Sequence, residues 1–220
     1  MAVKTSTNNY LSAANNLGID GGAITIEGWI RTASTPANDE FRSPFGQSSA
    51  GTSTTYRIYY RKDGTNPVAF QFSRSRTGVA DQAFDYVITL EVNRWYHLAL
   101  TYDGTTVRGY LDGDEVGSVA ASGTGTGGTS RVIIGARAES IATYWDGDID
   151  EVRFWDIAQS QVALKALRFR RVAGNEPNLV GYYRTDEGTS STANDMKQAV
   201  NMSWTGAPSW VGSAPISYPA

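Results

Sequence analysis

The sequence predicts an all-β domain, and three observations support that prediction. Short segments alternate apolar and polar residues with a period of two, which is typical of strands. Asp-Gly pairs and other turn signals separate these segments. The 220 residues include 23 Gly, 12 Tyr and 6 Trp, a composition that favours short strands joined by many turns. Sandwiches of this length commonly form one domain, so we expect a single domain over residues 1–220.

The first strong strand is expected over residues 23–31 (AITIEGWIR). Its two alternating rows both carry large apolar residues, isoleucines on one row and Trp29 on the other. A strand with apolar residues on both rows is buried on both faces. We therefore expect a central strand that is covered on both sides at Trp29.

Two regions predict hairpins. Residues 56–62 and 68–73 alternate on either side of DGTNP at 63–67, which is strand, turn and strand. Within residues 94–116, Asp103-Gly104 and Asp112-Gly113 each separate two alternating runs. Glycine adopts a positive φ without steric cost, so Asp-Gly is a strong hairpin signal. Two successive hairpins predict an antiparallel meander.

The other expected elements are shorter. Ser160 is a suitable N-cap for one short helix near residues 160–167. Three prolines after Ala207 favour an extended arm or edge element from about residue 207. The remaining predictions are a flexible polar loop at 122–130 and strands at 132–134 and 179–184.

Charge and composition exclude several function classes. The net charge is −3 and neither sign forms a long run, so no nucleic-acid footprint is visible. The cluster of Arg168, Arg170 and Arg171 is interpreted as a solvated helix end. The absence of cysteine removes disulfides, thiolate catalysis and cysteine-ligated zinc. No segment has the length of a membrane span, and residues 1–18 lack the pattern of a secretion signal.

Five motifs follow one another along the chain: ITIEGWIRT, NRWYHLALTYDGTTVRGYLDGDEVGS, VIIGARAES, DGDIDEVRFWDIAQSQ and LVGYYRTDEGTSSTANDMKQ. Their order resembles the laminin-G-like, concanavalin A-like superfamily, in its pentraxin-related branch, from about Asn8 to Trp210. The resemblance implies a jelly-roll β-sandwich of two curved antiparallel sheets. It also implies a structural role for the strand around His97. A lone histidine without a nearby orienting partner is more often a packing residue than a catalyst.

The acidic segment WDGDIDEVRFWD at 145–156 raises the question of glycoside hydrolysis. A regular strand would place Asp146, Asp148 and Asp150 on one face, about 7 Å apart. That separation falls within the range used by inverting enzymes, so distance alone does not exclude catalysis. Glucanases of the superfamily carry Glu-x-Asp-x-x-Glu or a close variant, and this sequence has no such motif. We therefore expect no enzyme, and an architectural strand with Val152 and Phe154 facing the core.

Asp150 is the candidate metal ligand. The resemblance implies that it helps to hold a structural Ca²⁺ on the convex side, together with backbone carbonyls. Calcium takes about six to eight oxygen ligands and needs neither Cys nor His. In a metal-free alternative, Asp150 accepts backbone N–H bonds or pairs with Arg153 or Arg184. Asp146 and Asp148 are expected to be exposed loop acids beside Gly147.

A ligand platform is expected on one row of the strand at 56–62. There an aromatic residue lies between two guanidinium groups, a combination that suits a sugar-binding surface. Residues of the next strand could join it, and two aromatics before the acidic segment could form its rim. The candidate residues are Arg57, Tyr59, Arg61, Gln71, Arg74, Tyr144 and Trp145. Two alternatives stay open: the arginines only solubilise an outward face while they stack on Tyr59, and Trp145 packs in the core.

Together these features predict a non-catalytic attachment domain that recognises a glycan or a partner protein. Its expected location is a virion or extracellular surface, with capsid or tail proteins as partners and self-association into a homo-oligomer. One alternative is a purely structural capsid-decoration or fibre module without sugar binding. Another is a domain of a longer secreted protein.

Overall fold

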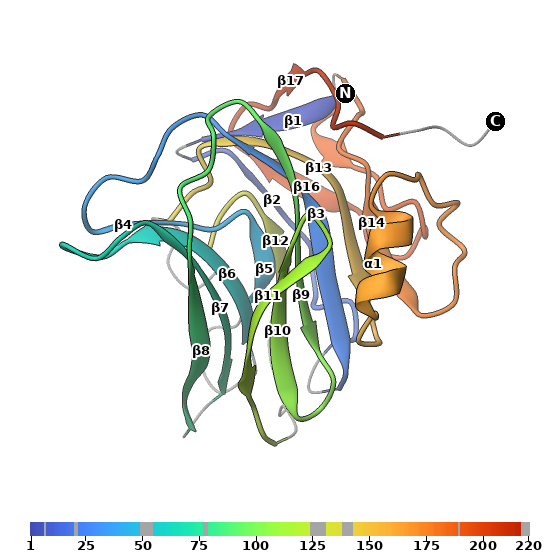
Figure 1. Ribbon diagram of the computed structural model, residues 1–220. Helices are drawn as coiled ribbons and strands as arrows, with labels where there is room; N and C mark the ends of the chain where they lie inside the picture. The colour runs from blue at the N-terminus through green and yellow to red at the C-terminus, as the bar shows by residue number, and fades with distance from the viewer. Residues whose placement is uncertain are drawn as a thin grey trace.

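The computed structural model describes residues 1–6, 8–19, 22–48, 55–76, 79–123, 131–137, 143–188 and 190–216. Strands make up 53% of the described residues and form two antiparallel sheets packed face to face (Figure 1). The architecture is consistent with a jelly-roll sandwich, so the predicted fold class is confirmed.

The first sheet contains the predicted central strand and the predicted meander. In spatial order its strands are β11 (Asp114–Ala120), β10 (Thr106–Leu111), β9 (Trp95–Tyr102), β3 (Ile24–Thr32), β13 (Gly147–Trp155), β1 (Ala2–Thr5) and β17 (Ser209–Val211), and β14 (Leu179–Tyr183) pairs with β13. In the turn between β10 and β11, Asp112 and Gly113 have φ values of 52° and 82°. A turn with two left-handed residues matches the twist of a hairpin, which explains the Asp-Gly sequence.

The second sheet contains the predicted hairpin at residues 56–73. Its strands are, in order, β15 (Thr192–Ala193), β16 (Met202–Thr205), β2 (Tyr10–Ser12), β12 (Arg131–Ile134), β5 (Phe45–Ser48), β6 (Thr55–Lys62), β7 (Ala69–Arg76) and β8 (Val79–Val87), and β4 (Glu40–Arg42) pairs with β6. Figure 1 shows β4, β6, β7 and β8 on the opposite side of the molecule from the helix.

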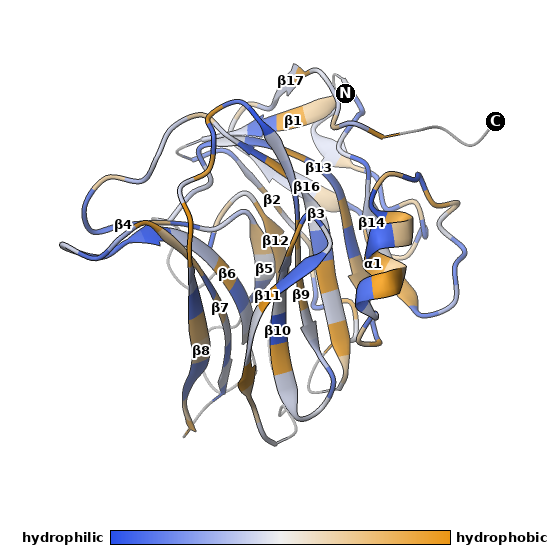
Figure 2. Cartoon of the chain, in the orientation of Figure 1, coloured by the Kyte–Doolittle hydropathy of each residue, from blue (hydrophilic) through white to orange (hydrophobic). Residues whose placement is uncertain are grey.

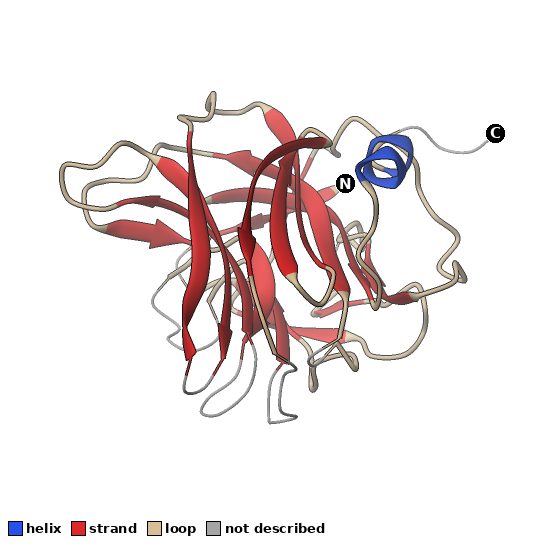
Figure 3. Cartoon of the chain, turned by 60° about the horizontal axis from the view of Figure 1, so that its bottom comes forward, coloured by secondary structure: helices blue, strands red, loops and turns tan. Residues whose placement is uncertain are grey.

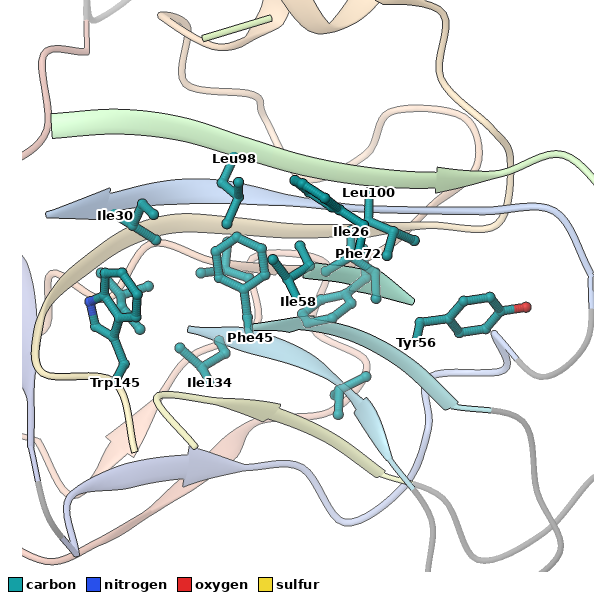
Figure 4. Packing of buried hydrophobic residues seen from close by; sticks show 14 of the residues in the cluster. Ile26, Ile30, Phe45, Tyr56, Ile58, Phe72, Leu98, Leu100, Ile134 and Trp145 are labelled. Carbon is teal, nitrogen blue, oxygen red and sulfur yellow. The ribbon is translucent and has the colours of Figure 1, made fainter. Parts of the chain in front are cut away.

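The hydrophobic core lies between the two sheets. Ile26 and Leu100 of the first sheet pack toward Phe45, Ile58 and Phe72 of the second, and none of the five is more than 1% exposed (Figure 4). Figure 2 shows hydrophobic and hydrophilic bands alternating along β10. Because successive side chains of a strand point to opposite faces, this alternation sends one row of each strand into the core.

Helix α1 (Gln161–Leu167) covers part of the outer face of the first sheet. The Ser160 side chain accepts a hydrogen bond from Ala163 N at 3.2 Å, so the predicted N-cap is present. Leu164 is buried against Ala99 and Tyr110 of the sheet. In Figures 1 and 3 the helix lies beside the strands, outside the space between the sheets.

Trp29 is covered on the outer face, as the sequence predicts. Its indole N–H donates to the carbonyl of Arg168 at 2.7 Å, and its ring lies 5.3 Å from that of Phe169. The segment after α1 therefore covers the centre of the first sheet. The cluster around Arg168 is not only a solvated helix end, because its backbone and Phe169 cover this sheet.

The C-terminal segment forms an edge strand. Strand β17 pairs antiparallel with β1 at the border of the first sheet. This position agrees with the predicted edge element beyond residue 207. Residues 217–220 and most of the predicted loop at 122–130 lie outside the described residues. Among the described residues, no helix has the length and apolar character needed to cross a membrane.

We predict that Phe72→Ala lowers the free energy of unfolding by about 3–5 kcal/mol, because it opens a cavity at a fully buried position. Urea unfolding of the purified variant measures this change. Val162→Ala is the matched control, because Val162 is 78% exposed on α1 and should change stability little. Equal losses in the two variants would contradict the assignment of the core.

Candidate functional site

The outer face of the second sheet carries the predicted row of β6. Tyr56, Ile58 and Tyr60 point into the core, so Arg57, Tyr59 and Arg61 point outward. Paired residues of an antiparallel sheet share a face. Tyr59 pairs with Gln71 of β7, and Gln71 pairs with Asp85 of β8. A polar row therefore crosses three neighbouring strands.

Ion pairs link the arginines of this row to acids of the turn and of β8. Arg57 contacts Asp81 at 2.9 Å. Arg61 contacts Asp63 at 2.9 Å and Asp85 at 2.7 Å. Burial raises the pKa of the Asp81 carboxyl, but the hydrogen bond from Ser75 and the charge of Arg57 outweigh it and hold that pKa below its usual value. We call these contacts the ion-pair ladder, with one rung at Arg57 and one at Arg61.

Tyr59 is covered by its neighbours. The residue is 4% exposed, and the ring of Phe41 on β4 meets it edge-on at 6.0 Å. The guanidinium groups of Arg57 and Arg137 lie 5.8 and 5.6 Å from its ring centre. The stacking of arginine on Tyr59 that the sequence suggested is present. The ring itself offers no open surface for a ligand.

A cavity of about 210 Å³ opens beside the Arg61 rung. It lies where the β6–β7 turn meets the end of β8. We call it the Arg61 cavity, and its lining residues are Arg61, Asp63, Asn66, Pro67, Ala69, Asp85 and Val87. The turn is held in shape by backbone donors, with Asn66 N bonded to the Asp63 carbonyl and Gly64 N bonded to the Asp39 side chain. Charged, amide and apolar groups thus converge on one small hollow.

Arg74 does not join the platform. It lies on the same row of β7 as Phe70 and Phe72, which faces the space between the sheets. Its guanidinium stacks on Tyr102 at 4.4 Å and donates to the carbonyl of Ser122 at 3.0 Å. The expectation that Arg74 would contribute to a ligand surface is corrected, because the period of two puts it opposite to Gln71.

The two expected rim aromatics lie elsewhere. Trp145 is fully buried, with its ring 6.1 Å from that of Tyr60, so the core alternative holds. Tyr144 is half-buried, and its hydroxyl donates to the Asn8 side chain at 2.8 Å. Neither residue lines the Arg61 cavity.

Asp150 is buried inside a bulge of β13. The pairing of β13 with β3 shifts between Asp150 and Arg153, and Glu151 has a φ of 55°. The Asp150 carboxylate accepts a hydrogen bond from Ala214 N at 2.9 Å. Its second oxygen has no hydrogen-bond partner among the described residues. Burial raises the pKa of this carboxyl to about 8, so its neutral form is favoured.

The surroundings of Asp150 do not fit a calcium site. The neighbouring Glu151 is held by Arg153 at 3.2 Å and by Arg171 at 3.0 Å, and it also accepts from the Tyr182 hydroxyl. Calcium requires several free oxygens, and two guanidinium groups oppose a cation. Within the described ranges, no group of three metal-ligating side chains forms. The backbone alternative describes Asp150, since Arg153 and Arg184 bind other acids, Glu151 and Asp186.

Two further acids of the segment, Asp146 and Asp148, are paired. Asp148 is 7% exposed within β13 and binds Arg31 at 2.7 Å, so the expectation of an exposed loop acid is corrected. Asp146 accepts from Ser34 at 2.7 Å and lies 3.6 Å from Arg42. Val152 and Phe154 face the core, as predicted. The segment is built as a structural strand of the first sheet.

His97 belongs to a buried polar network that sequence analysis did not identify. Its ring Nε2 lies 3.1 Å from Glu27, which also accepts from the Trp155 indole at 2.9 Å. Burial raises the pKa of Glu27, but the hydrogen bond from His97 and the charge of Arg153 lower it below its usual value. The period of two had already placed Glu27 on the covered row of Trp29. A buried acid requires hydrogen-bond or ion-pair partners, so the position of Glu27 on the covered row was the sequence signal for this network.

The family comparison agrees with this fold. The laminin G-type model of the concanavalin A-like lectin/glucanases superfamily matches residues 5–164. The chain belongs to this superfamily, as its motifs indicate. A comparison with curated protein sequences finds no match.

Several solved structures share the fold. A Bacteroides ovatus protein, to which carbohydrate binding has been ascribed, is 21% identical with a TM-score of 0.75; the alignment covers 98% of this chain but 61% of that protein. The heptameric SAP-like pentraxin of Limulus polyphemus is 15% identical, with a TM-score of 0.59 and coverage of 93% and 94%. The CBM40 domain of the Ruminococcus gnavus IT-sialidase, bound to α2,3-sialyllactose, is 13% identical, with a TM-score of 0.55 and coverage of 76% and 97%.

We predict that Asp150→Asn changes the pH dependence of stability. A carboxyl whose folded pKa is about 8, against an ordinary value of 3.8, contributes stability that is complete at low pH and is lost as pH rises toward 8. The variant should therefore gain stability relative to the wild type between pH 5 and pH 7.5, by up to about 1.4 kcal/mol per pH unit. Thermal melts across this range measure it, and parallel curves for the two proteins would contradict the assignment.

We also predict that a chelator leaves the melting temperature unchanged. A metal bound only to the folded state would stabilise it by mass action, and its removal would lower the melting temperature. Melts with EDTA and with added CaCl₂ should coincide. A decrease with EDTA that calcium restores would overturn the conclusion drawn for Asp150.

Proposed function

We propose that this domain is a non-catalytic carbohydrate-binding module that holds a glycan at the Arg61 cavity. The observation that carries the proposal is the convergence of Asp63, Asn66 and Asp85 with the apolar Pro67 and Val87 around one hollow. A sugar presents hydroxyl groups at its edge and C–H groups on its faces. A cavity that combines a few placed polar groups with apolar surface suits such a ligand.

The accessibility of the cavity supports the proposal. Val87 is 61% exposed, and the Asp63 and Asp85 side chains are 53% and 40% exposed. The centre of the other sheet is covered on its outer face by α1 and the segment after it. The fold similarity to the Bacteroides and Ruminococcus proteins also supports a glycan-binding role.

The proposed absence of catalysis follows from the arrangement and the burial of the acids. A glycosidase of the two-carboxylate type places two carboxyl groups on either side of the scissile bond. Asp63 and Asp85 instead converge on one group, the guanidinium of Arg61, from which both accept hydrogen bonds. Asp150 and Glu151 are at most 1% exposed, so a substrate does not reach them. Release of reducing sugar from a bound polysaccharide would overturn this part.

The location at a virion or extracellular surface remains a prediction from the sequence. The same holds for capsid or tail partners and for homo-oligomers. Glycan binding at the cavity requires none of them.

We predict that Arg61→Ala lowers the affinity for bound glycan at least about tenfold, equivalent to about 1.4 kcal/mol. The guanidinium orients both cavity carboxylates, and its loss leaves them without their common donor. Glycan-array screening of the wild type followed by calorimetry measures the change. Asn66→Ala, at the exposed turn, should also weaken binding without disturbing the sheet.

Arg57→Ala provides the matched control. Arg57 has a similar ion pair and a similar aromatic contact on the other rung, and it does not line the cavity. Its affinity should stay within about twofold of the wild type. Equal losses of affinity in Arg57→Ala and Arg61→Ala would show that the binding site extends along the whole outward row of β6. The absence of binding to any arrayed glycan would contradict the proposal.

A further inference from the structure

The charges of the Arg61 cavity are unequal. One guanidinium faces two carboxylates, Asp63 and Asp85, and no other charged residue lines the hollow in the described part of the chain. Asp39 adds a further acid behind the turn, where it accepts from Gly64 N at 2.8 Å. The lining therefore carries a net charge of about −1 at neutral pH.

The groups that a ligand meets are mainly hydrogen-bond acceptors. The Arg61 side chain is only 14% exposed, and its two terminal nitrogens already donate to the two acids. The carboxylates are three to four times more exposed, as the values of 53% for Asp63 and 40% for Asp85 show against that 14%. Gln71 donates to the second oxygen of Asp85 at 3.2 Å and fixes its orientation. The open carboxylate edges and the Asn66 amide are left to contact the ligand.

This arrangement of charges favours neutral ligands over anionic ones. A sugar hydroxyl donates to a carboxylate and accepts from an amide, so it satisfies both kinds of group. A carboxylate or sulfate on the ligand would bring like charges together in a partly dehydrated hollow, where they repel more strongly than in water. Arg61, the cation of the lining, is already paired with two acids and does not compensate a third.

We infer that the Arg61 cavity selects neutral saccharides with adjacent free hydroxyls and excludes uronic, sialylated and sulfated sugars. The inference rests on the proposed function and adds the substrate class to it. The other rung provides an internal contrast, because Arg57 contacts Asp81 at 2.9 Å and lines a hollow of about 10 Å³. Net negative charge and usable volume coincide at the Arg61 rung.

Native affinity electrophoresis tests the inference. The neutral probes are galactomannan, xyloglucan and arabinan, and the anionic probes are polygalacturonate, alginate and chondroitin sulfate. The wild type should be retarded by at least one neutral polysaccharide and by none of the anionic ones. Asp85→Asn should weaken binding to the neutral polysaccharide about tenfold. The double variant Asp63→Asn, Asp85→Asn leaves Arg61 unpaired, and it should gain retardation by an anionic probe.

Asp81→Asn is the matched control, since it makes the same change at the rung outside the cavity. It should behave as the wild type with every probe. Stronger retardation of the wild type by anionic probes would overturn the inference and leave glycan binding intact. Unchanged binding in the Asp85→Asn and double variants would remove the cavity as the selective site. No retardation by any probe would count against both the inference and the proposed function.

Discussion

The two-residue period of β6 is the constraint on which the candidate site depends. Tyr56, Ile58 and Tyr60 are each at most 1% exposed in the core, so the alternate residues must face outward. A shift of one residue in register would bury two arginines and expose three core side chains. The hydrophobic core thus determines the position of Arg61. The ion-pair ladder then holds its guanidinium against β8 and the neighbouring turn.

The polar groups of the two outer faces differ in their contact with water. On the outer face of the first sheet, Glu27, His97 and Arg153 are buried in a network of hydrogen bonds and ion pairs under the segment after α1. Such a network is costly to leave unsatisfied, so it fixes one arrangement of helix and sheet. On the second sheet, charges are paired across the surface and remain in contact with water around the Arg61 cavity. A ligand can displace water from this surface without the unfolding of any helix or strand.

Sequence analysis predicted the fold because period, turn chemistry and motif order agree. The strands around Trp29, the hairpin at 56–73, the meander and the helix capped by Ser160 all appear in the structure. Strand β8 was not predicted, because only Phe84 and Tyr86 form its apolar row, while Asp81 and Asp85 lie on the other row. Without β8, the partners of the β6 arginines were not identifiable.

Only part of the candidate site was predicted, because β8 was not identified. Arg57, Tyr59, Arg61 and Gln71 share one face, as the period of two required. Their acidic partners come from a turn and an edge strand, and pairing between distant segments does not follow from local pattern. Arg74 could have been excluded, since it lies three residues after Gln71 and thus on the opposite row. Asp150 was singled out by motif, but its bulge and its contact with Ala214 depend on tertiary structure.

Hydrogen–deuterium exchange with and without a saturating neutral glycan tests the central claim most directly. Occupation of the Arg61 cavity should slow exchange in the turn at 63–67 and at the end of β8 near Asp85, while α1 and β9–β11 stay unchanged. Protection confined to the outer face of the first sheet would contradict the account.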